Sequence, residues 1–351
     1  MTKCFGEAAE RTLKSLRTCS FLFIMLISLG IAVGLNTGMY SWCLAEDNAE
    51  ETVILDAIHD PSAIDGFAYP DHAEILRIFF PQIKECDSCL VTDGQDNILI
   101  DCATEDQVSR VVSMLRDLKI ERLNAVYITH PHSDHACGLK TILEEFRVDS
   151  VWTCFSDYTN EVSAALPGLC ESFHVPLMRY EEGHVFSLGK ARFETYASTD
   201  RALGINDRSA AFRMQYKDAV MFFLADLEAR GLRRLGNLLA PEMLKTDIIK
   251  YPHHGKNGLV REFWRPAQLR FAVVTSDSTP REGKEDLIYK GWAHAFTADG
   301  EIALLTDGTT WCVCWKEDAV KVLAGAFLPE ENGEEVTYLT VQKKEESNDQ
   351  R

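Results

Sequence analysis

Short apolar runs alternate with segments of helical periodicity along most of the chain after residue 74. Residues 107–119 carry apolar side chains at the spacing of an amphipathic helix, and residues 124–129 form a short apolar run typical of a buried strand. We expect further helices at 136–146 and 226–239, and further strands at 75–80, 97–100, 150–154, 192–197, 210–215, 219–224, 246–250, 271–275, 302–306 and 310–315. Strands interspersed with helices over about 250 residues predict one α/β domain rather than two.

The N-terminal segment has a different pattern. Residues 18–45 contain no charged side chain, and residues 21–35 are almost continuously apolar. A helix of this length can span a bilayer of about 30 Å. Basic residues precede it and acidic residues follow it, which places the N-terminus in the cytoplasm and the body outside. A cleaved signal peptide is the alternative, because Cys43-Leu44-Ala45 offers small residues ahead of a cut.

These patterns divide the chain into four parts. Residues 1–45 form a basic cytoplasmic segment with a transmembrane anchor or signal peptide, residues 46–72 an acidic linker, residues 73–328 the α/β domain and residues 329–351 a charged tail. We therefore expect the domain on the outer side of the cell membrane, or secreted after signal cleavage. The net charge of −18 argues against an extended nucleic-acid-binding surface, because so acidic a body repels polyphosphates at long range.

Five of the ten histidines fall in two clusters, at residues 130–135 (HPHSDH) and 253–254. The first cluster directly follows the predicted strand 124–129, so that His130 and His132 point the same way before the chain turns into a helix. Imidazole nitrogens and carboxylate oxygens suit zinc and other first-row divalent ions. Two ions about 3.5–4 Å apart need roughly this many ligands and a bridging carboxylate. The sequence therefore predicts a two-metal site.

The pattern His130-x-His132-x-Asp134-His135 after an apolar strand resembles the signature of the metallo-β-lactamase superfamily. Its surroundings resemble the hydrolase domain of competence protein ComEC and its stand-alone relatives. The landmarks that occur in the same order are Leu99-Ile-Asp-Cys102, Asn206-Asp-x-Ser209, Ala225-Asp226-Leu-Glu228, Tyr251-Pro-His-His-Gly255 and Thr306-Asp-Gly308. The resemblance spans about 73–320 and implies an αββα sandwich, here preceded by one N-terminal hydrophobic helix.

The resemblance also implies roles for the clustered residues. His130 and His132 would bind the first of two divalent ions, Asp134 and His135 the second, and Asp226 both. One member of the pair His253 and His254 would complete the second site. The other member would contact the substrate or donate a proton.

The motifs do not identify the third ligand of the first ion. Other branches of the superfamily place a histidine before the strand pair that leads to the bridging aspartate, but this chain has Asn206 and Asp207 there. Asp207 is therefore a candidate ligand, and Asn206 and Ser209 are candidate substrate contacts. Zinc is the expected metal, although an oxygen ligand would soften the first site and favour manganese.

Together these residues predict hydrolysis by a hydroxide that bridges two divalent ions, because a divalent cation can lower the pKa of water from 15.7 to about 7. Asp134 would orient the hydroxide, and the non-ligand histidine, such as His254, or Lys256 would steady the leaving oxygen. The ComEC-type resemblance implies a phosphodiester of nucleic acid or of a phosphorylated envelope component, so the expected partner is a small-molecule or phosphodiester substrate. An acyl hydrolase for lactams, lactones or thioesters is one alternative. A surface binding protein that keeps the hydrolase fold but has lost catalytic activity is another.

Several loops depart from the pattern of the relatives. The chain has Lys84-Glu85-Cys86-Asp87 in place of Gly-Gln-Gly-Asp, Cys137 in place of the first of two glycines, and Leu224-Ala225 in place of Thr-Gly. Loss of these glycines changes close-packed loops around the site, so the loops do not identify the substrate. The spacings Cys86-x-x-Cys89 and Cys312-x-Cys314 suit zinc or disulfides, but neither has a second pair beside it, and ordinary thiols are the simpler interpretation.

Overall fold

The computed structural model describes residues 74–155, 160–315, 321–323 and 339–340. One sheet has ten strands in the order β19-β18-β17-β16-β1-β2-β3-β5-β7-β8, and the other has seven in the order β15-β14-β13-β12-β11-β10-β9. The strands of the first sheet are β1 (Leu76–Phe80), β2 (Cys89–Thr92), β3 (Asn97–Ile100), β5 (Ala125–Ile128), β7 (Val151–Thr153), β8 (Leu177–Arg179), β16 (Ile302–Thr306), β17 (Trp311–Trp315), β18 (Lys321–Leu323) and β19 (Leu339–Thr340). Those of the second are β9 (Val185–Leu188), β10 (Ala191–Tyr196), β11 (Ala211–Tyr216), β12 (Ala219–Phe223), β13 (Ile248–Lys250), β14 (Phe271–Val274) and β15 (Ala293–Phe296).

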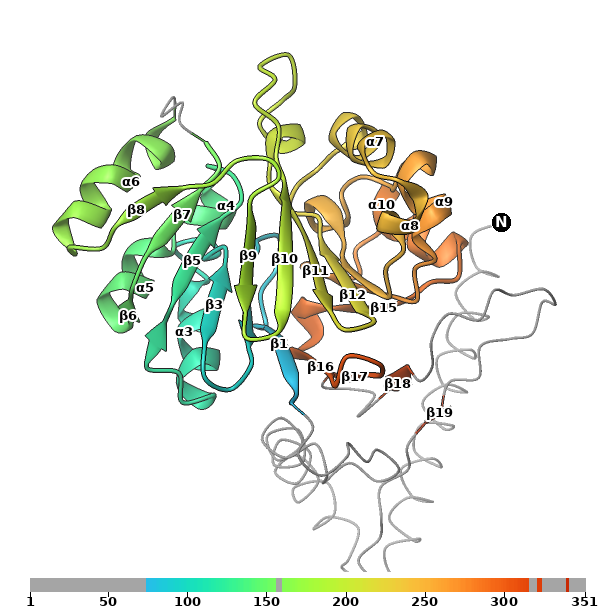
Figure 1. Ribbon diagram of the computed structural model, residues 1–351, viewed down its shortest axis with the longest axis horizontal. Helices are drawn as coiled ribbons and strands as arrows, with labels where there is room; N and C mark the ends of the chain where they lie inside the picture. The colour runs from blue at the N-terminus through green and yellow to red at the C-terminus, as the bar shows by residue number, and fades with distance from the viewer. Residues whose placement is uncertain (1–73, 156–159, 316–320, 324–338, 341–351) are drawn as a thin grey trace, which may run out of the picture. The chain divides into compact units, whose positions relative to one another are not determined.

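Helices cover the outer face of each sheet. The helices and 3₁₀ turns are α3 (Val108–Asp117), α4 (Ser133–Ala136), α5 (Leu139–Glu145), α6 (Glu161–Ser172), η2 (Asn206–Arg208), α7 (Ala229–Leu238), α8 (Pro241–Leu244), η3 (Pro252–Gly255), α9 (Arg261–Ala267), α10 (Glu282–Tyr289) and η4 (Thr297–Asp299). A further two-stranded ladder joins β4 (Arg122–Leu123) to β6 (Arg147–Val148). In Figure 1, α3, α5 and α6 flank the first sheet on the left, and α7 to α10 flank the second on the right. The layer order is therefore the predicted αββα sandwich.

Three apolar clusters hold these layers together, and the alternation of side chains along each strand explains them. Ala125 and Tyr127 of β5 lie in the cluster between the sheets, whereas Val126 and Ile128 lie in the cluster beneath α3 and α5. Phe222 of β12 joins a third cluster with residues of α7 and α9. Because successive side chains of a strand point to opposite faces, a strand buried on both faces reads as a continuous apolar run.

Strand direction determines where functional side chains can meet. β3, β5, β7 and β8 pair in parallel, and so do β12, β13, β14 and β15. In parallel α/β sheets, the loops after the carboxyl ends of the strands gather at one edge. The segments after β3, β5, β12, β13 and β14 therefore supply the site described below.

The predicted strands are all present, and their ends differ from prediction by at most two residues. The helix predicted at 136–146 is present as α5 but begins three residues later, because Cys137 and Gly138 separate it from the short helix α4. The helix predicted at 226–239 begins only at Ala229, since Asp226 belongs to the loop. The sequence analysis did not identify β2, β8, β9, β15, α6, α9 or α10.

Gly138 occupies a position where no side chain fits. A Cβ atom there would lie 2.0 Å from the carbonyl oxygen of Cys102 and 2.8 Å from a methyl carbon of Val108. We expect Gly138→Ala to lower the free energy of unfolding by roughly 2–3 kcal/mol, because backbone of the neighbouring loop must shift. Gly168 of α6 is a matched control, since a Cβ there meets nothing within 4 Å. Gly168→Ala should raise the free energy of unfolding by about 0.5–1 kcal/mol. Equal effects of the two variants in urea unfolding would contradict the prediction.

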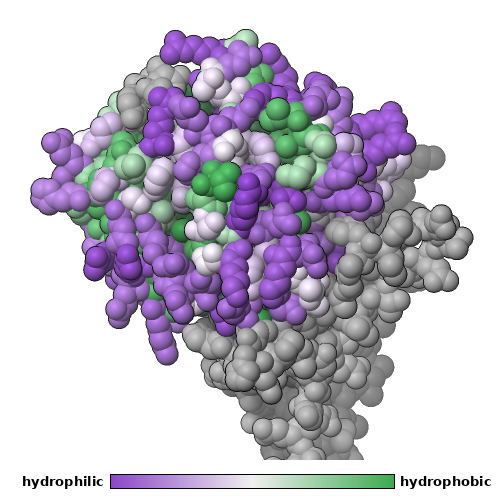
Figure 2. Space-filling view, viewed as in Figure 1, coloured by the Kyte–Doolittle hydropathy of each residue, from purple (hydrophilic) through white to green (hydrophobic). Residues whose placement is uncertain are grey.

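The predicted N-terminal helix, the acidic linker and nearly all of the C-terminal tail lie outside the described residues. Among the helices that the structure does describe, none has the length and apolar character needed to cross a membrane. The eight cysteines in the described ranges are free thiols, and Cys312 and Cys314 approach to 3.7 Å between their sulfur atoms. The face seen in Figure 2 is mostly hydrophilic, with apolar side chains in separate small areas.

Candidate metal centre

His130, His132 and Asp226 form the first group of potential ligands, at the ends of β5 and β12. His130 Nε2 lies 3.0 Å from His132 Nδ1 and 3.9 Å from Asp226 Oδ2. The ligand atoms of all three residues lie within 4.8 Å of one another. His130 and Asp226 are fully buried, whereas His132 is only half-buried. The first group therefore has one side open toward solvent.

Asp134, His135, His254 and Asp226 form the second group. His135 Nε2 lies 3.2 Å from Asp226 Oδ1, and His254 Nε2 lies 3.4 Å from the same oxygen. His254 Nε2 also lies 3.3 Å from Asp134 Oδ2. Asp226 thus turns one carboxylate oxygen toward each group, as a bridging ligand must.

Three atoms of the second group have no hydrogen-bond partner among the described residues, although all are buried. They are His135 Nε2, His254 Nε2 and Asp226 Oδ1. A buried polar atom without a partner is costly, and three that converge on one point need a common explanation. A divalent cation would satisfy all three, and the nitrogen and oxygen donor set suits such an ion. The residues present therefore fit a divalent metal ion.

A layer of carboxylates behind the histidines fixes their orientation. His135 Nδ1 lies 2.7 Å from Asp101 Oδ2, and Asp101 in turn accepts hydrogen bonds from the backbone N–H and the hydroxyl of Thr129. His254 Nδ1 lies 3.1 Å from Asp87 Oδ1, and the Thr275 hydroxyl donates to the same oxygen at 2.6 Å. A carboxylate on the second ring nitrogen fixes the tautomer and the orientation of a metal-binding histidine.

Lys250, at the end of β13, is a buried cation inside this network. Its ammonium group pairs with Asp87 Oδ2, donates to the backbone oxygen of Ala225 at 3.0 Å and lies 3.9 Å from Asp226 Oδ1. Only 4% of Lys250 is exposed. The sequence analysis missed Lys250 as a site residue, although a single charge at the end of an apolar strand, three positions before His253, is a usable signal.

The motif segment can now be compared with known families. Residues 84–153 match the model of the metallo-β-lactamase superfamily. The matched segment contains Asp87, Asp101 and the whole HPHSDH cluster, in agreement with the predicted resemblance over these residues. The αββα order of the described domain is consistent with the metallo-β-lactamase fold. No curated protein matches the chain.

Solved structures with the metallo-β-lactamase fold resemble this chain at low sequence identity. The Rm3 metallo-β-lactamase is 18% identical over 51% of this chain and 79% of its own length, with a TM-score of 0.37. The metallo-β-lactamase fold protein YhfI from Bacillus subtilis is 11% identical over 66% of this chain and all of its own length, with a TM-score of 0.44. A diphosphatase from the PhnP family is 15% identical over 57% and 85%, with a TM-score of 0.35.

The two groups of candidate ligands differ in protonation. Burial lowers the pKa of His130 well below its usual value, and burial also lowers the pKa of His132. Burial likewise favours neutral His135, but the surrounding carboxylates outweigh it and raise the pKa of His135 to about 10. The same balance raises the pKa of His254 well above its usual value. The first pair of imidazoles is therefore neutral, and the second pair is protonated when no ion is bound.

Zinc binding to the metal-free protein should release protons and tighten as the pH rises. The pKa of His135 is raised to about 10, and the pKa of His254 is raised well above its usual value. Both imidazoles therefore carry a proton at neutral pH, and a metal ion must displace it. The apparent association constant should rise roughly tenfold per pH unit for each proton displaced. Isothermal titration calorimetry in buffers of different ionisation enthalpy measures this release. An affinity that does not change between about pH 6 and 8 would contradict the assignment.

Left-handed backbone is concentrated at the loops of the centre. His253 (φ 49°) and His254 (φ 53°) are consecutive non-glycine residues in this conformation, and Ala225 (φ 46°) adopts it directly before Asp226. Each such residue costs on the order of 1–3 kcal/mol and persists only where its surroundings hold it. Glycine adopts this conformation at no steric cost, whereas Ala225 must be held in it. The backbone oxygen of Ala225 accepts from both Lys250 Nζ and the N–H of His253, which holds it in place.

The structure places three predicted residues outside the two ligand groups. Asp207 is not positioned as a ligand of the first ion, because its Oδ1 accepts hydrogen bonds from the backbone N–H groups of Glu228 and Gly231 at the start of α7. Asn206 Nδ2 donates to Glu228 Oε1 and lies 3.4 Å from His253 Nε2, so Asn206 borders the first group. The hydroxyl of Ser209 is buried and has no partner among the described residues.

His253 and Lys256 also lie differently from His254. His253 is partly exposed, with Nε2 3.7 Å from Asp226 Oδ2 and Nδ1 2.8 Å from Asn257 Oδ1. Lys256 Nζ lies 3.8 Å from Glu85 Oε2, and the described residues show no ion pair between it and the ligand carboxylates. His254 is fully buried between Asp134, Asp226 and Asp87, which suits a ligand better than a proton donor.

Proposed function

We propose that this chain is a dinuclear metal-dependent hydrolase of the metallo-β-lactamase superfamily, related to the ComEC-type hydrolase domains, and that it hydrolyses phosphodiesters. The observation that supports it best is the position of Asp226, whose two oxygens face two separate sets of ligand atoms. His130, His132 and Asp226 would hold the first ion. Asp134, His135, His254 and Asp226 would hold the second.

The buried charge supports two ions rather than one. When the histidines are neutral, as metal ligands are, the carboxylates of Asp87, Asp101, Asp134 and Asp226 are opposed among these residues by the ammonium group of Lys250, which leaves three negative charges in a largely buried volume. Uncompensated buried charge is strongly unfavourable. Two divalent cations and one hydroxide would make the centre neutral, whereas one cation would leave it negative. We propose zinc as the metal and manganese as the alternative, and elemental analysis of the purified protein distinguishes them.

When bound, such ions supply Lewis acidity, which lowers the pKa of water to about 7 and polarises an oxygen of the substrate. Asp134 would accept a hydrogen bond from the attacking water. Burial alone would raise the pKa of Asp134, but the nearby imidazoles of His254, 3.3 Å from its Oδ2, and His135 outweigh burial and lower the pKa to about 2. Asp134 is therefore ionised, and able to accept, over the whole working pH range.

We assign the proton for the leaving oxygen to His253 rather than to His254. His253 is the partly exposed member of the pair, and Asn257 and Glu228 hold its Nδ1 while its Nε2 faces the first group. Asn206, beside Nε2, is positioned to contact the substrate. Lys256, paired with Glu85, would act on the substrate only if that pair opened.

Hydrolysis of bis(p-nitrophenyl) phosphate by the zinc- or manganese-loaded protein tests the proposal. Asp134→Ala should lower the rate by about 10²–10³, the effect of removing one polar group that acts on the transition state. Asp117→Ala is the matched control, because Asp117 is exposed at the end of α3. Equal rates in the Asp134→Ala variant and the wild type would contradict the mechanism.

Nitrocefin and lactones assayed beside the phosphodiester distinguish an acyl hydrolase from a phosphodiesterase. Weak metal occupancy with no hydrolysis would indicate a binding protein that has lost catalytic activity.

We also propose that residues 1–45 anchor the domain on the outer side of the membrane, or direct its secretion. The uncharged segment 18–45 and the change from basic to acidic flanks support this location. Fractionation of cells that express the full-length chain distinguishes the two forms, and recovery of the intact chain in the cytoplasmic fraction would contradict both.

A further inference from the structure

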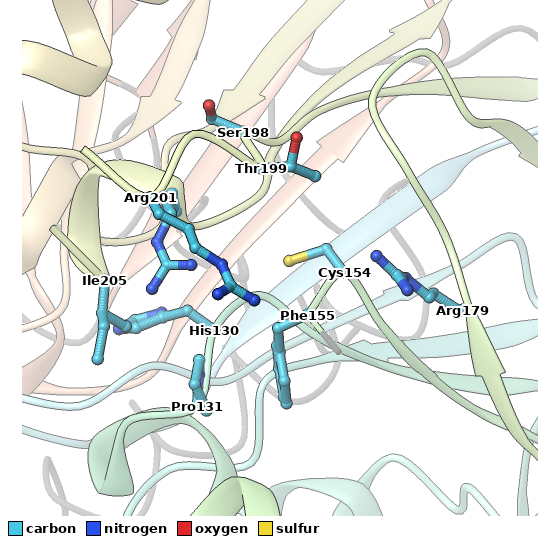
Figure 3. Close-up of a pocket in the computed structure, with 10 residues that line it drawn as sticks. His130, Pro131, Cys154, Phe155, Arg179, Ser198, Thr199, Arg201 and Ile205 are labelled. Carbon is cyan, nitrogen blue, oxygen red and sulfur yellow. The ribbon is translucent and has the colours of Figure 1, made fainter. Parts of the chain in front are cut away.

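A cavity of about 130 Å³ adjoins the first ligand group. His130, which belongs to that group, also lines the cavity, together with Arg179, Arg201 and Arg208. The hydroxyl residues Ser198 and Thr199 line it as well. Figure 3 shows Arg201 extending toward His130 and Arg179 approaching from the other side of the cavity. The cavity therefore brings three guanidinium groups next to the candidate metal centre.

The charge of this cavity is opposite to that of the chain as a whole. The protein has 54 acidic and 36 basic residues, yet the described residues that line the cavity include three arginines and no carboxylate. Arg179 has a distant ion pair with Glu181, at 3.9 Å between two exposed side chains, which leaves its guanidinium group available. A positive cavity in an acidic protein concentrates an anionic group locally despite the overall repulsion.

The lining chemistry suits a phosphate group. Guanidinium groups bind phosphate through paired hydrogen bonds in a fixed geometry, and hydroxyl groups can add further donors. A cavity of about 150 Å³ admits benzene, so the present volume admits one phosphate group but not a whole nucleotide. Arg179, Thr199 and Arg201 are exposed, so the cavity is open toward solvent on that side.

We infer that the arginine cavity binds a terminal phosphate of the substrate, next to the phosphodiester that lies on the metal centre. The substrate class is then a short phosphodiester with a phosphomonoester end rather than an uncharged-end diester or a long polyanion. This inference rests on the phosphodiesterase activity proposed above. His130 borders both sites, which places the terminal phosphate on the side of the first ligand group.

Three dinucleotides test this specificity with the zinc-loaded full-length protein: TpT, its 5′-phosphorylated form pTpT and its 3′-phosphorylated form TpTp. One phosphorylated form should be cleaved at least about tenfold more efficiently than TpT, as kcat/KM, because hydrogen bonds to charged groups contribute that much. Arg201→Gln and Arg179→Gln should each reduce this preference toward one, and Arg201→Lys should retain part of it. Arg110→Gln, an exposed arginine of α3, is the matched control and should retain the whole preference.

A binding measurement separates failure of this inference from failure of the proposed function. Thymidine 5′-monophosphate and thymidine 3′-monophosphate are titrated into the metal-free protein by calorimetry, and one should bind roughly 10- to 100-fold more weakly to Arg201→Gln than to the Arg110→Gln control. If bis(p-nitrophenyl) phosphate is hydrolysed but the wild type shows no preference among the dinucleotides, the terminal-phosphate site is wrong and the hydrolase proposal stands. If no phosphodiester is hydrolysed but monophosphate binding depends on Arg201, the phosphate site stands and the hydrolase proposal is wrong. Equal binding to both variants overturns the site.

Discussion

Asp226→Asn is expected to reduce the hydrolysis of bis(p-nitrophenyl) phosphate by about 10³-fold or more and to leave at most one tightly bound metal ion per chain. The side chain is buried and turns one oxygen toward each ligand group. An amide keeps the shape of the carboxylate but replaces one oxygen with a group that cannot bind a cation, and it removes a negative charge from between the two sites. One substitution should therefore affect both ions.

Metal content per chain, measured by elemental analysis after dialysis, is read beside the rate. Asp117→Asn, at an exposed position of α3, controls for the loss of one negative charge and should keep full metal content and activity. Two ions retained per chain with a loss of rate of less than about tenfold would contradict the bridging role of Asp226.

Lys250→Met should lower the free energy of unfolding of the metal-free protein by about 3–5 kcal/mol, because removal of one partner leaves a buried charge uncompensated. Lys250 pairs with Asp87, and both side chains are almost completely buried. Burial alone would raise the pKa of Asp87, but Lys250 and the nearby histidines outweigh burial and hold that pKa below its usual range. Urea unfolding followed by circular dichroism measures the change.

Lys140→Met is the matched control for the loss of a lysine. Lys140 is exposed on α5, where it pairs with Glu144 at 3.6 Å, and such surface pairs contribute only about 0.3–0.5 kcal/mol. The double variant Asp87→Asn with Lys250→Met should recover part of the lost stability, because the uncompensated carboxylate is gone. A loss of stability no larger than that of Lys140→Met would show that the buried pair does not stabilise the fold.

The sequence was sufficient for the layers of the fold because each strand is short, apolar and bounded by polar turns. Residues 97–100 and 302–306 were predicted with their observed ends. Helix α6 was not identified, because Pro167 and Gly168 interrupt its helical pattern, and only the Asn160 capping box marks its start. The break between α4 and α5 was also missed, since apolar periodicity continues across Gly138 and does not reveal that its neighbour Cys102 needs the space.

The sequence predicted those parts of the candidate site in which residues close together along the chain also lie close together in space. The structure brings His130, His132 and Asp226 together in one group, and Asp134, His135, Asp226 and His254 in another. The position of Asp207 as a metal ligand could not be judged from sequence, because its role depends on whether its carboxylate faces the site or the amides of α7. The pairing of Lys250 with Asp87, which are far apart in sequence, was likewise invisible until both sheets were placed.

The ligands of the proposed centre come from both halves of the sandwich. The HPHSDH segment follows β5 of the first sheet, whereas Asp226 and His254 follow strands of the second. A metal ion held between them would act as a chemical cross-link that fastens one sheet to the other, in a domain whose eight described cysteines form no disulfide. Because such an ion binds only the assembled sheets, occupancy of the centre and cohesion of the fold would rise and fall together.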